Sequence, residues 1–146
     1  MKAEIIMALR GSRDLAEFIL MNYSGKVVEV GAGNILDVAL KLHSLEIVAT
    51  DSQERLIGGM KVERDDIFSP MKEIYRGASL IYSIRPPIEL QIAMGELALE
   101  IGADVLIRPL EDEVVDLHGF SKNLMNIGEA RFYLFRHKYQ PRFSPF

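Results

Sequence analysis

Short apolar runs alternate with helix-like segments between residues 12 and 107, and this alternation constrains the fold more than any other feature of the sequence. Strands are expected over residues 27–30, 46–50, 61–63, 79–83 and 104–107. Their apolar residues are nearly continuous rather than alternating, which is typical of strands that are covered on both faces. The pattern therefore predicts an α/β fold, Rossmann-like and doubly wound, around a mostly parallel sheet.

Segments with apolar residues at helical spacing separate these predicted strands. Helices are expected over residues 2–9, 12–23, 35–42 and 88–101. Ser12 is the expected N-cap of the second helix, and Ser24 with Gly25 ends it. Gly102 is expected to cap the last of the four helices.

The final part of the chain has a different pattern. Residues 117–125 and 131–137 are strand-like, and the turn sequence NIGE at 126–129 joins them, which predicts a C-terminal antiparallel strand pair. Residues 141–146 are expected to be extended. Because no linker is recognisable and the length suits one core, a single domain over residues 1–146 is expected.

Composition narrows the classes of function. The net charge of -4 gives no strong nucleic-acid signature and no attraction to an anionic membrane. The absence of cysteine removes disulfides and thiolate chemistry, and it suits the cytoplasm. The three histidines lack metal-ligand spacing, and no apolar run approaches the roughly 20 residues of a membrane helix. We therefore expect a cytoplasmic protein without a membrane segment or a metal site, and either a homo- or a hetero-oligomer is compatible with the sequence.

A glycine turn with the sequence EVGAGN follows the first predicted strand, at residues 29–34. Two glycines allow the backbone to turn tightly and to approach a ligand closely. Asp51 ends the next strand about 20 residues later, where a carboxylate accepts hydrogen bonds from ribose hydroxyls. Leu36 stands where a dinucleotide turn has its third glycine, and the carboxylate of Glu29 would repel a pyrophosphate. An NAD-dependent oxidoreductase is therefore the less favoured interpretation.

The glycine turn and its acidic partner resemble the class I S-adenosylmethionine-dependent methyltransferases, and the resemblance covers roughly residues 12–138. The first motif of that family, acid-x-Gly-x-Gly, matches residues 29–33. Its second motif, an acid that ends strand two, matches Asp51. A terminal antiparallel strand pair is also typical of that fold.

Two further motifs extend the resemblance. The acid that follows strand three in the family, near the adenine, matches Asp66 or its neighbour Asp65. A polar residue followed by Pro-Pro ends strand four of the family, and SIRPP at residues 83–87 falls there. The stretch YSIRPP also resembles a small archaeal family of methyltransferase-like proteins.

The resemblance implies a binding site for S-adenosylmethionine. The residues that it assigns to this cofactor are Glu29, Gly31, Ala32, Gly33, Asp51, Ser52, Asp66 and Ile67. The glycine turn would line the methionine part, and Asp51 would hold the ribose hydroxyls. Asp66 would face the adenine amine, and Ile67 would pack on the ring. A further glycine often follows the turn in the family, and this chain has Ile35 there, which crowds the turn.

Arg85 is the second departure from the family pattern, because amino-methylating members often have Asp or Asn before the Pro-Pro pair. A guanidinium group donates hydrogen bonds only and stays protonated, so it neither accepts a proton nor orients an amine. Ordinary amine methylation through this motif is therefore not expected.

A guanidinium fork is instead well suited to phosphate or carboxylate. The tripeptide Ile-Arg-Pro at 84–86 recurs at 107–109, so Arg85, Pro86 and Arg108 are candidates for an anion site at neighbouring strand ends. In the alternative interpretation each arginine pairs with a local acid. The acids considered are Glu89, Glu111 and Asp112.

Three functional hypotheses remain from the sequence. The first is an S-adenosylmethionine-binding protein, and within it a methyltransferase that acts on an anionic small molecule or on RNA. The second is a non-catalytic Rossmann module that binds a ligand or serves as a scaffold. The NAD-dependent oxidoreductase is the third. The acceptor, and turnover itself, are not specified by the residues.

Overall fold

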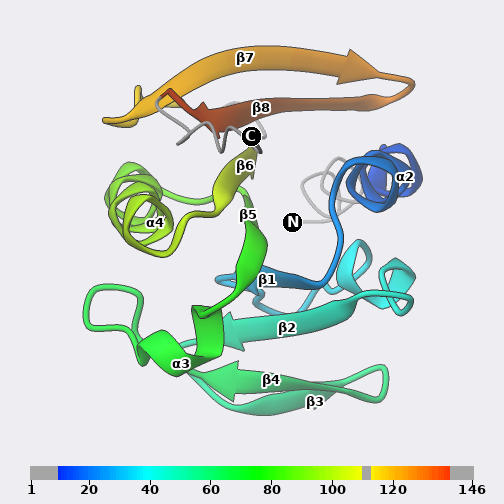
Figure 1. Cartoon of the computed structure of the whole chain (residues 1–146). Coiled ribbons are helices and arrows are strands. Elements are labelled where there is room, and N and C mark those ends of the chain that lie inside the picture. Colours follow the sequence, from blue (N-terminus) through cyan, green and yellow to red (C-terminus); the bar gives the residue numbers. More distant parts are fainter. Residues whose placement is uncertain (1–9, 110–112, 139–146) are drawn as a thin grey trace, which may run out of the picture.

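The computed structural model describes residues 10–109 and 113–138, which form one twisted sheet with helices on its two faces (Figure 1). Its helices are α2 (Ser12–Asn22), α3 (Lys72–Tyr75) and α4 (Ile88–Ile101), with a 3-10 turn η1 (Ala39–Lys41). Its strands are β1 (Lys26–Val30), β2 (Glu46–Asp51), β3 (Arg55–Ile57), β4 (Met60–Arg64), β5 (Ala78–Ile84), β6 (Asp104–Arg108), β7 (Phe120–Ile127) and β8 (Ala130–His137). The predicted helix over 2–9 and the predicted extended tail lie outside the described residues.

The eight strands follow the order β3-β4-β2-β1-β5-β6-β8-β7. Strands β4, β2, β1, β5 and β6 are parallel to one another, whereas β3, β8 and β7 pair antiparallel with their neighbours. The predicted Rossmann-like α/β fold with a C-terminal antiparallel pair is therefore confirmed. The chain reverses its direction of progress across the sheet between β1 and β5, and ligands of such sheets bind at this switch point.

Two apolar layers cover the sheet. Buried residues of α2 pack against one face and those of α4 against the other, as the positions of the two helices in Figure 1 show. Helix α4 has the predicted bounds, and Gly102 ends it in the left-handed conformation with a φ of 85°. Among the described residues, no helix is long and apolar enough to cross a membrane.

The helix expected over residues 35–42 is wrong, because only the three-residue η1 forms there. The apolar residues of this segment are nevertheless buried, among them Leu36, Val38 and Leu42. Successive turns bring these side chains to the core. The apolar residues at helical spacing therefore marked buried positions and did not indicate a helix.

Three smaller corrections concern turns. Ser12 is the first residue of α2 rather than its N-cap, since Gly11 takes the N-cap position with a φ of 78°. The strand β3 was not predicted, although Gly58 and Gly59 form its turn to β4 with positive φ. The predicted four-residue turn of the last hairpin is shorter, because Ile127 pairs directly with Ala130.

Candidate functional site

A cavity of about 580 Å³ opens at the carboxyl ends of β1, β2 and β4, beside the switch point of the sheet. The residues that line it are Val30, Gly31, Thr50, Asp51, Ser52, Arg64, Asp65, Asp66, Ile67, Phe68, Met71 and Leu90. The exposed surface of this wall is mostly apolar, although half of the lining residues are polar or charged, and its carboxylates lie on the side of β2 and β4. Cavities of this size and character are typical of sites for small molecules.

The glycine turn forms the edge of the cavity above β1. Gly31 has a φ of 68°, and a Cβ atom there would lie 3.2 Å from Leu90 Cδ2, so a larger residue would both strain the backbone and enter the cavity. The Ala32 amide donates to the Thr50 carbonyl at 3.0 Å, and this bond ties the turn to β2. Ala32 and Gly33 belong to the turn but do not line the cavity, whereas Gly31 does.

Asp51 lies at the end of β2, with Ser52 next to it in the cavity wall. Its Oδ2 atom accepts a hydrogen bond of 3.2 Å from the Gly33 amide. The same oxygen lies 3.3 Å from Arg55 Nη2 on β3. In the described part of the chain, all hydrogen bonds and ion pairs of this carboxylate fall on Oδ2, which leaves Oδ1 for a ligand.

The adjacent acids after β4 have different roles. Asp65 faces the protein, since its Oδ1 accepts from the Met71 amide at 2.9 Å and its Oδ2 accepts from the Tyr75 hydroxyl at 2.5 Å. Burial and this carboxylate raise the pKa of Tyr75 well above its usual range. Asp66 is exposed and accepts the Phe68 amide at 3.0 Å through Oδ1 only. Ile67, which is 8% exposed, presents an apolar surface beside it.

Glu29 lies below the glycine turn, in the sheet face that α2 covers, and not in the cavity wall. It is 1% exposed, and its Oε1 accepts a hydrogen bond of 2.7 Å from the Tyr82 hydroxyl. Burial raises the pKa of the Glu29 carboxyl to about 8, an effect that the Tyr82 hydrogen bond partly offsets. A group of this kind holds its proton at neutral pH and brings no full negative charge to the turn.

Arg85 follows β5 and has a φ of 58°, a rare conformation for a residue with a side chain. Its amide donates to the Arg108 carbonyl at 2.9 Å. Its side chain lines a separate hollow of about 360 Å³ together with Glu89 and Glu113. Pro86 is buried, and its carbonyl accepts a hydrogen bond of 3.1 Å from Gln91 Nε2 at the start of α4.

Arg108 has a different environment, because it is 6% exposed and donates through Nη2 to the carbonyl of Arg10. Burial lowers the pKa of Arg108, and the charge of Arg85 lowers it further, so the two guanidinium groups interact. Of the acids considered as partners for the arginines, Glu111 and Asp112 lie outside the described residues.

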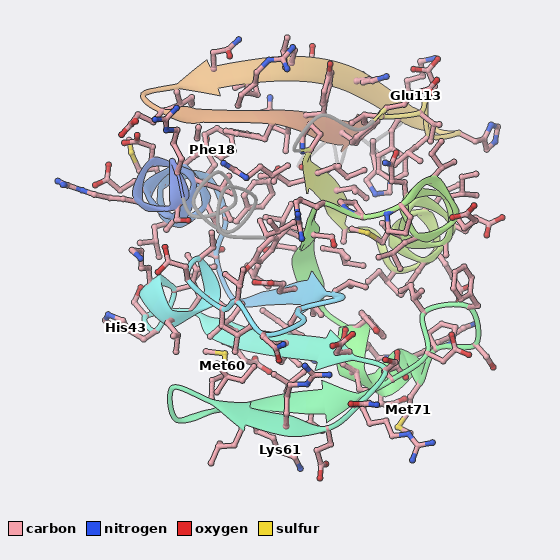
Figure 2. The ribbon with its side chains drawn as sticks, turned by 180° about the vertical axis from the view of Figure 1, so that it is seen from behind. Phe18, His43, Met60, Lys61, Met71 and Glu113 are labelled. Carbon is pink, nitrogen blue, oxygen red and sulfur yellow. The ribbon has the colours of Figure 1, made fainter. Side chains whose placement is uncertain are left out.

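Several wall residues were not predicted from the sequence. Phe68 and Met71 form an apolar rim, with exposed fractions of 65% and 62%, and Figure 2 shows Met71 on the segment that follows β4. Leu90 reaches the cavity from α4. The motif IFSPM after the acid pair carried the only local signal, namely large apolar residues in a loop. Nothing local indicated Arg55, which reaches the site from the unpredicted β3.

Several solved structures share this fold. The S-adenosyl-L-methionine methyl transferase from Silicibacter pomeroyi DSS-3 superposes with a TM-score of 0.64, at 14% identity, over 92% of this chain and 94% of that one. The yhhF protein from Escherichia coli superposes with a TM-score of 0.59, at 12% identity, over 88% and 86% of the two chains. At these identities the likeness concerns the fold, which is that of the methyltransferase-like Rossmann proteins.

Comparison of the sequence with known protein families identifies the family of the chain. Residues 3–137 match UPF0146, described as an uncharacterised protein family. A UPF0146 protein from Archaeoglobus fulgidus is 43% identical over 125 residues, which are 84% of this chain and 92% of that protein. Another from Methanothermobacter thermautotrophicus is 44% identical over 126 residues, which are 82% and 91% of the two chains. The chain belongs to the UPF0146 family, and the expected likeness to a small archaeal family of methyltransferase-like proteins is confirmed.

Proposed function

We propose that this protein binds S-adenosylmethionine in the cavity at the carboxyl ends of β1, β2 and β4. One observation carries the proposal: the cavity combines a glycine turn, a strand-end carboxylate and an exposed acid next to an apolar surface. Each of these groups suits one part of the cofactor. The fold shared with methyltransferase structures supports the same reading.

The residues present fit the parts of this cofactor. The Oδ1 atom of Asp51 remains to accept a hydrogen bond from a ribose hydroxyl, with Ser52 beside it. Asp66 offers an exposed carboxylate to an exocyclic amine, and Ile67 offers an apolar face to an adenine ring. Gly31 lets the main chain approach the methionine part. When bound, the cofactor would supply an electrophilic methyl group on its sulfonium sulfur.

NAD fits the turn less well. A dinucleotide pyrophosphate is held by the N-terminus of a helix that follows the glycine turn. In the described chain this segment contains only η1, which is three residues long and begins at Ala39. Leu36 is buried where the third glycine would stand.

The proposal extends to an anionic acceptor, a small molecule or an RNA, held by Arg85. Its support is that Arg85 is exposed at the end of β5, next to the switch point, and interacts with a second guanidinium group. Arg108 is buried and bonded to the Arg10 carbonyl, so direct contact with an acceptor falls to Arg85. Arg85→Ala should then weaken methyl transfer to an anionic acceptor while leaving cofactor binding unchanged.

A non-catalytic binding module is the second candidate, and the same residue favours it. Arg85 accepts no proton and no hydrogen bond, so it supplies no base at the position where the family orients its acceptor. Cofactor binding without methyl transfer to any tested acceptor would favour this alternative.

Equilibrium binding of S-adenosylhomocysteine, the product form of the cofactor, tests the proposal. Asp51→Asn should weaken binding at least about tenfold, because a hydrogen bond to a charged group contributes about 1.5–3 kcal/mol. Asp37→Asn is the matched control, since Asp37 is an acid of the connection between β1 and β2 that pairs with Lys41 and does not line the cavity. Equal affinity of the Asp51 variant and the wild type would contradict the proposed site.

A further inference from the structure

Arg55 connects the two sides of the proposed cofactor site. Its Nη2 lies 3.3 Å from Asp51 Oδ2, and its Nη1 donates to Asn34 Oδ1 at 2.5 Å. Asn34 belongs to the glycine turn and Asp51 to the end of β2. One guanidinium group therefore spans the turn that would contact methionine and the carboxylate that would contact ribose.

The ion pair between Arg55 and Asp51 is partly shielded from solvent. The side chains of Arg55 and Asp51 are 25% and 19% exposed, so solvent screens this pair less than the ion pairs on the open surface. The planar fork of arginine also restricts the direction of both partners. The Gly33 amide approaches the same Oδ2 atom at 3.2 Å, so two donors from separate segments converge on one carboxylate oxygen.

The contacts of Arg55 with Asn34 and Asp51 take the place of a helix that is absent after the glycine turn in the described chain. In many Rossmann folds a helix begins directly after the glycine turn and holds it. Here the connection after the glycine turn consists of turns and irregular backbone up to the short η1. The β3–β4 hairpin lies at the edge of the sheet in Figure 1, and Arg55 extends from it to the turn.

The hairpin is itself anchored on η1. A Cβ atom on Gly58, at its tip, would lie 3.0 Å from Leu40 Cδ1, so the tip packs closely against η1. The start of β3 is hydrogen-bonded to Asn34 through Arg55, and the tip of the hairpin packs against Leu40 at Gly58. The connection from the glycine turn to η1 is thus held by the hairpin at both ends.

We propose that Arg55 is the positioning residue of this site. It orders the glycine turn and turns the Asp51 carboxylate so that Oδ1 faces the cavity and receives the ribose of an adenosine ligand. The part of this inference that concerns ribose rests on the proposed function. The part that concerns the order of the turn does not, and the two are measured separately.

Hydrogen exchange of the Gly33 amide, followed by NMR without ligand, tests the first part. Arg55→Met keeps the unbranched apolar part of the side chain and removes its fork, so Asp51 is released and the Gly33 amide should exchange about tenfold faster. Arg55→Lys keeps the charge and should restore part of the protection. Lys61→Met is the control, because Lys61 lies on the same hairpin and pairs only with Glu54 and Glu63 among the described residues.

Titration with S-adenosylhomocysteine tests the second part on the same proteins. Arg55→Met should weaken binding about tenfold, Arg55→Lys less, and Lys61→Met not at all. Unchanged Gly33 exchange in Arg55→Met, or equal exchange in Lys61→Met, would overturn the inference. Faster exchange with wild-type affinity would overturn the ribose part alone. If the wild type binds no cofactor, the proposed function fails, whereas the exchange result still decides the role of Arg55 in the turn.

Discussion

Replacing Glu29 with glutamine should change the pH dependence of stability in a defined direction. Burial raises the pKa of Glu29 from 4.5 to about 8 in the folded protein. Between these values the unfolded chain releases the proton while the folded chain keeps it. The wild type therefore loses stability as the pH rises through this window. Below about pH 4.5 both states are protonated and this loss of stability is absent.

The size of the effect follows from the shift. Each pH unit inside the window lowers the free energy of unfolding by about 1.4 kcal/mol. The wild type should therefore lose about 3 kcal/mol of stability between pH 5 and pH 7 through Glu29. Glutamine has nearly the same shape and still accepts the Tyr82 hydroxyl, but it does not titrate. The difference in unfolding free energy, variant minus wild type, should therefore rise by about 3 kcal/mol over this range.

Urea denaturation at pH 5, 6 and 7, followed by circular dichroism, measures this difference. Glu46→Gln is the control, because Glu46 is an exposed glutamate on the neighbouring strand β2 and pairs with Lys26. A difference for Glu29→Gln that stays flat from pH 5 to pH 7 would contradict the raised pKa of Glu29. It would mean that Glu29 is ionised in the folded protein and brings a negative charge to the glycine turn.

Two backbone predictions follow from positive φ angles. Arg85→Gly should be about 1 kcal/mol more stable than Arg85→Ala in chemical denaturation, because both lose the side chain but only alanine retains the strain of a φ of 58°. Equal stabilities would show that the conformation is not strained. Gly11→Ala should lose about 2–3 kcal/mol, since its Cβ would lie 2.6 Å from the Glu129 carbonyl oxygen. Gly25→Ala, where φ is similar but no atom lies within 4 Å, should lose only about 1 kcal/mol in the same assay. Similar losses in the two variants would contradict the role of that close contact.

The parallel core of the fold was predictable because its strands are continuous apolar runs. Burial on both sheet faces selects such runs, and β5 and β6 contain fully buried residues on each face. Helix α4 was equally predictable, because its fourteen residues carry apolar side chains at helical spacing and Gly102 follows them as a C-cap. The strand-end positions of Asp51 and of the glycine turn followed from this order of elements.

Other parts depend on contacts between distant residues. The apolar spacing of 35–42 favours a helix locally, but turns bury the same side chains, and sequence pattern alone does not separate the two. The role of Arg55 depends on its contacts with Asn34 and Asp51, which become its neighbours only when β3 and β4 join the sheet beside β2. The β3–β4 hairpin has a recognisable turn signal in Gly58 and Gly59, but its first strand is only three residues long.

Binding of the cofactor to the wild-type protein is the most direct test of the proposed S-adenosylmethionine site. S-adenosylmethionine, S-adenosylhomocysteine and NAD should be titrated in parallel by calorimetry. We expect micromolar binding of the first two at one site and no binding of NAD. No binding of either sulfur-containing ligand, or a preference for NAD, would contradict this expectation and would leave the glycine turn with a structural role alone.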